Sequence, residues 1–300
     1  MPDIISSILP DKEVSILAGA SGAGKTTLIM QALAAMQQGK EVFGHECQPG
    51  LRLGYIAADR SWRSYQRTAE LSSLDLGSIK VRALIDDPAI DLANFEKSPL
   101  DELERLIASM LPLDLVAVDP LVVFLGVDTN KYHLSAARLI RLNKACLANN
   151  ITILGTHHAT KARSDYSFKR PQDRISGTSA LLGFTSSQLF LAAPEETSRE
   201  DGFYEFHVIS HHAAPKVILL SREGGRFRHE GTEETSYVST SPTNQLMNLL
   251  KNGPLKREDI LSSVSGSRAT IDRLLASALA AKVIERGQYG HYGLVGAFES

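Results

Sequence analysis

The sequence predicts an α/β fold, in which a mainly parallel sheet has helices on both faces and an antiparallel extension, followed by a small C-terminal winged helix-turn-helix. Three observations support this. Apolar strand-like runs alternate with helical ones between residues 14 and 158. From residue 181 the runs become short and are separated by turns. After a polar stretch at 230–243, three helical segments precede a strand-like pair. We therefore expect two domains, residues 1–235 and 241–300.

The first element is an apolar run, VSIL, followed by GASGAGKT, which matches the phosphate-binding pattern G-x-x-x-x-G-K-[ST] at every position. Its glycines let backbone N–H groups turn toward phosphate oxygens, and the start of the next helix adds positive potential. We expect Lys25 to reach the β- and γ-phosphates of ATP and Thr26 to hold Mg²⁺. A glycine-rich turn without a ligand is the alternative. The expected nucleotide-binding residues are Gly19, Ala20, Ser21, Gly22, Ala23, Gly24, Lys25, Thr26 and Thr27.

Local sequence signals also predict the helices and strands that follow the loop. The helix after the glycine-rich loop reaches Gly39, a suitable C-cap. Ser98 and Pro99 suit the N-cap and first position of another helix. Further apolar, strand-like runs cover residues 51–59, 79–85, 113–124 and 151–158. The helical runs between them cover residues 61–74, 98–111 and 132–150.

Two strand-ending carboxylates complete the expected site. In a parallel sheet the ligand crevice lies outside the carboxyl ends of the strands, so Lys25, Asp59, Asp119 and His157 should converge there. Asp119 ends the run LDLVAVD and is expected to support Mg²⁺ together with Thr26. Asp59 is the candidate base that orients the attacking water, although capping the following helix is an alternative role.

Two histidines end the fifth strand-like run. One of them could contact the γ-phosphate and distinguish ATP from ADP through a charge-assisted hydrogen bond, and we take His157 as that residue. A structural histidine is the alternative.

Basic residues in two segments suggest contact with DNA. Between residues 159 and 176, aromatic side chains are interleaved with cations, a composition that suits single-stranded DNA, although a solvated surface loop is the alternative. In the C-terminal unit the third helical segment could face DNA, or the unit could be a protein-packing module. The candidate DNA-binding residues are Lys161, Arg163, Lys169, Arg170, Arg174, Arg268 and Arg273.

The composition sets broad limits. The chain of 300 residues has a net charge of −2, so DNA binding would need a local patch rather than a global attraction. Two cysteines without metal-binding spacing suit a reducing compartment. No signal pattern or membrane-length apolar run is present, and we expect a cytoplasmic protein without a membrane partner.

The order and spacing of GASGAGKTTL, GYIAAD, LVAVDPL, GTHHATK and GTSALLG resemble the RecA-like P-loop ATPases, most closely the RepA-like hexameric replicative helicases (AAA_25). The resemblance implies a RecA-like core, hydrolysis of Mg²⁺-ATP coupled to DNA in replication or recombination, and a head-to-tail ring or filament of identical subunits. It makes Lys25 and Thr26 the Walker A pair, Asp119 the Walker B carboxylate and His157 a phosphate sensor. It further implies that Lys161 begins a DNA-facing loop and that residues 176–179 form the small-residue turn after it.

Two departures from the family keep other functions open. Asp59 stands where the family has glutamate. His211 and His212 stand where the family carries a cation that enters the neighbouring subunit's site, and Lys216 and Arg222 are out of register with that position. A neutral histidine cannot supply the missing charge. An ATP-gated DNA-binding or regulatory protein with weak hydrolysis is therefore the alternative, and a small-molecule kinase is a third class.

Overall fold

The computed structural model describes residues 3–88, 90–159, 175, 179–192, 202–234, 246, 249–250, 253–264, 268–280, 283–287 and 290–296. The chain forms two compact units. The described residues before Thr235 belong to the larger unit and those after Ser236 to the smaller one.

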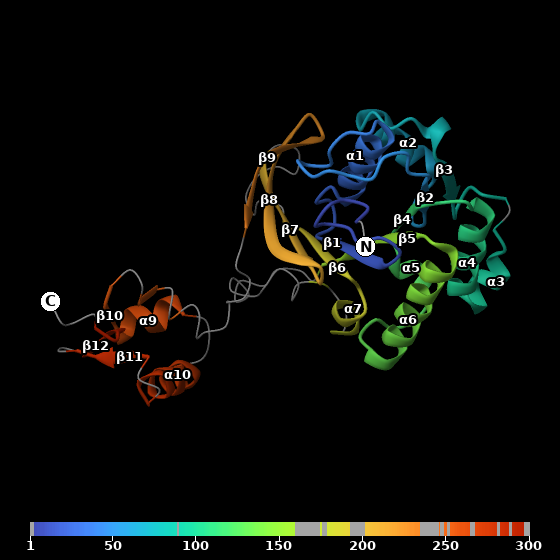
Figure 1. The fold of residues 1–300 in the computed structure, drawn as a ribbon. Helices are drawn as coiled ribbons and strands as arrows, with labels where there is room; N and C mark the ends of the chain where they lie inside the picture. The colour runs from blue at the N-terminus through green and yellow to red at the C-terminus, as the bar shows by residue number, and fades with distance from the viewer. Residues whose placement is uncertain are drawn as a thin grey trace. The chain divides into compact units, whose positions relative to one another are not determined.

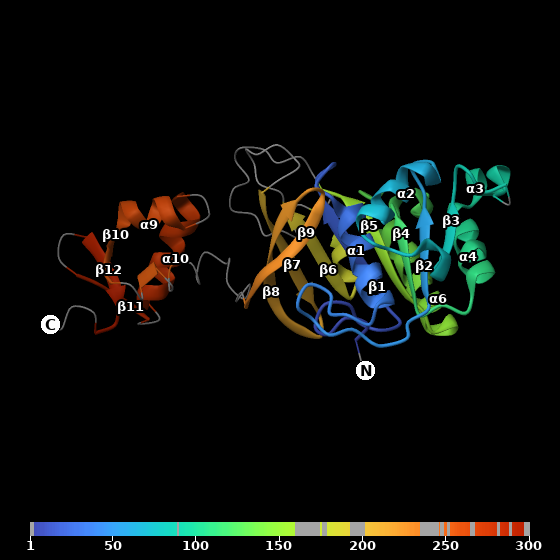
Figure 2. The same ribbon diagram turned by 90° about the horizontal axis from the view of Figure 1, so that it is seen from above.

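The larger unit is built on a sheet with the strand order β3-β2-β4-β5-β1-β6-β7-β8-β9 among the described residues (Figure 1). Strands β3 to β6 in that order run parallel, and β7, β8 and β9 continue the sheet antiparallel, as Figure 2 shows from above. The bounds are β1 Val14–Gly19, β2 Leu53–Ala57, β3 Lys80–Ala83, β4 Leu115–Asp119, β5 Thr152–His158, β6 Ser187–Ala192, β7 Gly202–Ser210, β8 Ala213–Glu223 and β9 Arg226–Glu234.

This architecture confirms the expected α/β class with a mostly parallel sheet. One strand was assigned wrongly from the sequence: β6, expected in the antiparallel extension, lies parallel to β1 with Ile16 opposite Gln188. The physical reason is the long connection from β5 to β6, which contains α7 and returns the chain to the edge where β5 began.

Helices cover both faces of the sheet, as expected. Helices α1 and α2 pack on one face, and the helices from α3 to α7 pack on the other. In β4, Leu115 and Ala117 join the first core while Val116 and Val118 join the second, which explains why the strand is apolar throughout. The bounds are α1 Lys25–Gln37, α2 Trp62–Leu71, the 3-10 turn η1 Leu76–Ser78, α3 Leu92–Lys97, α4 Pro99–Met110, α5 Val122–Leu125, α6 Tyr132–Asn149 and α7 Ser179–Gly183.

The expected helix signals lie where the helices start and stop. Pro99 is the first residue of α4 after Ser98, and Gly39 takes the left-handed conformation (φ 63°) just beyond α1. No helix among the described residues combines the length and apolar character that crossing a membrane requires.

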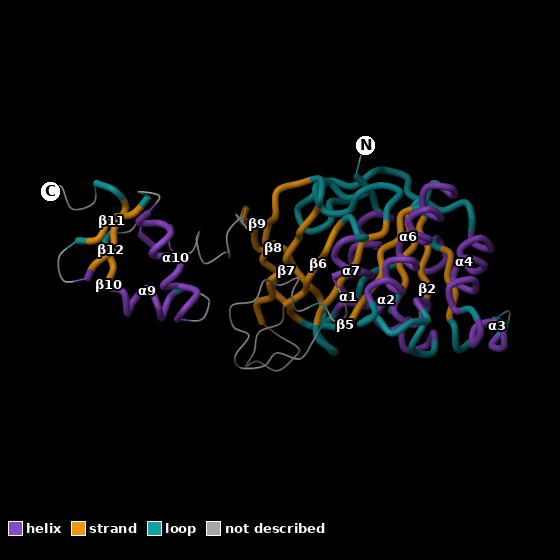
Figure 3. The backbone as a smooth tube through the Cα atoms, turned by 90° about the horizontal axis from the view of Figure 1, so that it is seen from below, coloured by secondary structure: helices purple, strands orange, loops and turns teal. Residues whose placement is uncertain are grey.

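The smaller unit has its own apolar core, formed by residues that include Leu250, Ile260 and Ile271. Figure 3 shows its helices beside three short strands, whose order is β10-β12-β11. Arg257 of α9 pairs with Asp272 of α10, with Nη2 2.6 Å from Oδ1. The bounds are β10 Leu255–Lys256, α9 Arg257–Ser263, α10 Arg268–Ala280, β11 Ile284–Arg286 and β12 His291–Leu294.

Candidate functional site

The glycine-rich loop joins the carboxyl end of β1 to the start of α1. Gly22 and Gly24 have φ values of 78° and 98°, a region that side chains with a Cβ disfavour. A Cβ at Gly24 would also lie 2.9 Å from Cζ of Phe227, a residue of β9. Both the backbone conformation and the close approach of β9 therefore require glycine at this position.

Lys25 begins α1 and folds back over the loop. Its Nζ donates hydrogen bonds to the carbonyl oxygens of Gly19 (2.9 Å) and Ala20 (3.0 Å). Burial lowers the pKa of Lys25, although the carboxylates of Asp119 and Asp59 oppose that shift. The ammonium thus lies at the mouth of the loop, held by neutral carbonyls that a phosphate anion would outcompete.

Asp119, at the end of β4, is the centre of a buried hydroxyl network. Its side chain is 5% exposed. Oδ2 accepts hydrogen bonds from Thr26 Oγ1 and Tyr55 Oη, both at 2.7 Å, and Oδ1 accepts one from Thr156 Oγ1 at 2.5 Å. A carboxylate and a hydroxyl side by side are the hard oxygen donors that Mg²⁺ prefers, so Thr26 and Asp119 fit the expected metal.

Asp59 follows β2 at the same edge of the sheet. Its Oδ1 accepts a short hydrogen bond from Tyr65 Oη and lies 3.3 Å from Nε of Arg60. The alternative role for Asp59 as a helix cap is wrong, because the N-cap residue of α2 is Ser61. The first N–H of the helix, at Trp62, donates to Asp86 instead.

The two histidines of β5 face opposite sides of the sheet. His157, the expected phosphate sensor, is only 3% exposed and is absent from the residues that line the cleft over the loop. His158 lines that cleft, together with Thr156. The expectation that His157 lies at the cleft is therefore wrong, and His158 lies there instead, because alternate residues of a strand point to opposite faces.

The residues described above that line a single cleft of about 500 Å³ include Thr26, Thr156 and His158. The cleft brings together Lys25, Asp59 and Asp119 as expected, and it contains two arginines that the site prediction did not include, Arg60 and Arg222. Arg60 directly follows a strand-ending carboxylate, a local signal that could have identified it. Among the described residues, the lining is Ser21, Gly22, Gly24, Lys25, Thr26, Thr27, Asp59, Arg60, Thr68, Asp119, Pro120, Thr156, His158 and Arg222.

Arg222, near the tip of the β8–β9 hairpin, lines this cleft. The Arg222 guanidinium lies 5.3 Å from the centre of the Phe227 ring, and Phe227 is 4% exposed. Gln31 of α1 fixes the hairpin, because its Nε2 donates to Phe227 O (3.0 Å) and its Oε1 accepts from Phe227 N (2.8 Å). The hairpin is thereby attached to the helix that carries the loop.

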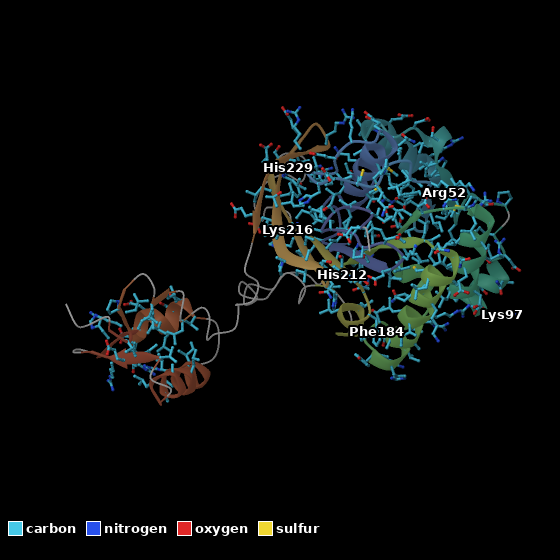
Figure 4. The ribbon with its side chains drawn as sticks, in the orientation of Figure 1. Arg52, Lys97, Phe184, His212, Lys216 and His229 are labelled. Atoms are coloured by element: carbon cyan, nitrogen blue, oxygen red, sulfur yellow. The ribbon has the colours of Figure 1, made fainter. Side chains whose placement is uncertain are left out.

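The two histidines that stand where the related ATPases carry a cation do not lie at this cleft. His211 and His212 form the turn between β7 and β8, and His212 Nε2 is 3.2 Å from Glu13 Oε2, beside the amino end of β1 (Figure 4). They are therefore at the opposite edge of the sheet from the loop of their own chain.

The expected DNA contacts are mostly outside the described residues. Arg268 is exposed at the start of α10, and Arg273 belongs to α10 but its side chain is not described. The loop candidates that lie outside the described residues are Lys161, Arg163, Lys169, Arg170 and Arg174.

A profile of the AAA domain family AAA_25 matches residues 1–164, more than half of the chain. The matched segment holds the glycine-rich loop, Asp59, Asp119 and both histidines of β5. A search of curated proteins found no match.

Proposed function

The chain belongs to the AAA_25 family of P-loop ATPases, and from this premise we propose that it is a RecA-like ATPase that hydrolyses Mg²⁺-ATP and acts on DNA in replication or recombination. The observation that carries the proposal is the hydrogen bond between Thr26 and the buried Asp119, beside the loop-bound ammonium of Lys25. A cation and a pair of oxygen donors thus line the same cleft, as binding of a metal–phosphate complex requires.

Each group has a defined task in hydrolysis. Lys25 would bind the β- and γ-phosphates, and residues 19–27 would hold the triphosphate through the loop and the N-terminus of α1. Thr26 and Asp119 would hold Mg²⁺, which neutralises phosphate charge when bound. Asp59 is half exposed to the cleft, so that it can accept a proton from the attacking water.

The DNA-directed part of the proposal rests on the sequence. The basic, aromatic segment at 159–176 follows β5 directly in the sequence, and we infer that bound nucleotide influences it. The smaller unit, read as a winged helix-turn-helix, presents Arg268 at the start of α10. The resemblance to RepA-like helicases adds a head-to-tail ring or filament of identical subunits as the working assembly, with single-stranded DNA as partner.

A second candidate function is an ATP-gated DNA-binding or regulatory protein with slow hydrolysis. The specific observation in its favour is the pair His211 and His212 at the position where the family carries a cation. His212 is instead paired with Glu13 of its own chain. Without a charge from a neighbour, turnover would be slow while ATP binding stays intact.

The test is steady-state ATP hydrolysis with and without Mg²⁺ and single-stranded DNA, over a range of protein concentrations, with Lys25→Ala as the inactive control. Turnover that requires Mg²⁺ and rises with DNA supports the DNA-coupled ATPase. Tight ATP binding with little turnover, unchanged by DNA, supports the switch. Normal turnover in Lys25→Ala would reject the assignment of the loop.

A separate double variant tests the proposed contact with DNA. Lys169→Glu with Arg170→Glu should weaken binding of single-stranded DNA and flatten its salt dependence, because two phosphate contacts are lost. The matched control is Lys40→Glu with Lys97→Glu, which changes charge equally at two exposed lysines outside the cleft. An equal effect of both double variants would mean that only net charge matters.

A further inference from the structure

Arg60 occupies a position in the cleft that no part of the proposed mechanism uses. It follows Asp59 directly, at the carboxyl end of β2, and lines the cleft with Lys25 and Thr26. We propose that Arg60 is a catalytic residue that supplies positive charge to the γ-phosphate bound by its own chain. When ATP binds, Arg60 moves from Asp59 to that phosphate. This role rests on the proposed ATPase function.

The contacts of Arg60 connect the two sides of the cleft. Its Nε lies 3.3 Å from Asp59 Oδ1, and its Nη2 lies 3.5 Å from Thr26 Oγ1. The guanidinium also stands 4.9 Å from the centre of the Tyr65 ring. One arginine therefore touches both the candidate base and the candidate Mg²⁺ ligand, so it already lies between the groups that would surround the γ-phosphate.

The pairing with Asp59 is weak enough to be exchanged. The side chains of Arg60 and Asp59 are 53% and 42% exposed, and ion pairs this accessible to water contribute little. A phosphate offers a denser negative charge and a geometry that a guanidinium binds with two parallel hydrogen bonds. Entry of the γ-phosphate would therefore draw Arg60 away from Asp59.

That exchange would free Asp59 at the moment it is needed. While Arg60 is bound, its Nε donates to Oδ1 of Asp59 and occupies that carboxylate oxygen. In hydrolysis the water oxygen forms a bond to Pγ and passes a proton to Asp59. The bond from Pγ to the β–γ bridging oxygen breaks, and that oxygen keeps the electron pair as ADP leaves. Arg60 would then stabilise the negative charge on the transferred phosphoryl oxygens.

The other cations in the described lining of the cleft are placed differently. Lys25 is held by the loop carbonyls, as expected of a ground-state phosphate ligand. Arg222 stacks on Phe227, and its Nη1 lies 3.5 Å from the position of a Cβ built on Gly24. Arg60, by contrast, contacts both Asp59 and Thr26.

The experiment compares Arg60→Ala with Arg63→Ala, an exposed arginine in the first turn of α2 that does not line the cleft. We expect turnover of Arg60→Ala to fall about 100-fold or more, ADP affinity to change less than about threefold because ADP lacks the γ-phosphate, and Arg63→Ala to match wild type. Near-normal turnover in Arg60→Ala, or an equal loss of ADP affinity, would overturn the proposal, as would a turnover loss seen in Arg222→Ala and not in Arg60→Ala.

Mixing two inactive variants separates action within the chain from action on a neighbour. Arg60→Ala subunits keep Lys25, and Lys25→Ala subunits keep Arg60. If Arg60 serves its own site, the mixture stays inactive; restored turnover would show that Arg60 serves the adjacent subunit and would refute the proposal. A wild-type protein without ATP binding would instead reject the proposed ATPase function and this role with it.

Discussion

The cleft is built by two regions that contribute in different ways. The parallel half of the sheet supplies the reactive groups, because β1, β2, β4 and β5 all end at the same edge and present Lys25, Asp59, Asp119 and Thr156 there. The antiparallel β8–β9 hairpin, far along the chain, supplies Arg222 to the cleft and packs Phe227 against Gly24. The parallel half thus contributes the groups of the proposed mechanism, and the hairpin packs against the glycine-rich loop.

The two regions also differ in the kind of interaction that they use. Around Asp119 a buried carboxylate satisfies three hydroxyl groups, so removing its charge disturbs several partners at once. At the hairpin the Phe227 ring packs on Gly24, and neutral amide hydrogen bonds join the Phe227 backbone to Gln31 of α1. Changes in the parallel half should therefore affect turnover most, and changes at the hairpin should affect stability first.

The largest effect is expected for Asp119→Asn. Losing the carboxylate removes an Mg²⁺ ligand, and with several kcal/mol of charge stabilisation lost, turnover should fall by about 10²–10³. The amide should also cost about 1–3 kcal/mol of folding free energy, because the hydroxyl donors lose a charged acceptor. Asp114→Asn, just before the same strand and paired with the exposed Arg52, is the control and should leave turnover unchanged. Normal turnover in Asp119→Asn would remove β4 from the site.

Gly24→Ala should come next, and it tests the hairpin contact directly. The left-handed backbone alone costs roughly 1–2 kcal/mol with a Cβ present, and the clash with Phe227 adds to that. Gly39→Ala has the same backbone problem at φ 63° but meets nothing within 4 Å. The difference between the two melting temperatures measures the hairpin contact. Equal losses would mean that the ring of Phe227 moves aside freely.

Gln31→Ala should have a smaller effect. It removes two neutral hydrogen bonds to Phe227, worth about 1–2 kcal/mol together by urea unfolding. Gln37, on the same helix, makes the same pair of bonds to the backbone of Asp75, but those bonds are exposed. Gln37→Ala should therefore cost less than Gln31→Ala. The reverse order would show that the hairpin does not stabilise α1.

The smallest effect concerns the pH dependence of stability. Burial lowers the pKa of Lys25 from its ordinary value of 10.5, so the unfolded chain binds this proton more tightly than the folded protein does. Stability contributed by this group therefore rises with pH in the window between the lowered pKa and 10.5. Lys25→Met should flatten that rise, measured as the unfolding midpoint in urea across the window. An identical slope in both proteins would contradict the assigned direction.

Much of the candidate site could be predicted from the sequence, because its parts are local. The glycine-rich loop, Lys25 with Thr26, and the strand-ending carboxylates Asp59 and Asp119 each follow directly from a short apolar run. The expected placement of His157 at the cleft was wrong, because a one-residue difference in a strand reverses which face a side chain occupies. The parallel pairing of β6 was also missed, since pairing partners are set by the whole sheet.

The sequence by itself determined the α/β class, the phosphate-binding loop and which carboxylates stand at strand ends, because these depend on hydrophobic periodicity and on a contiguous motif. Only the tertiary structure decided that Arg60 lies between Asp59 and Thr26, that His158 lines the cleft, and that Phe227 packs against Gly24. The physical reason is that such contacts join residues through packing between elements. Their distances depend on the register and curvature of the whole sheet, which no local segment encodes.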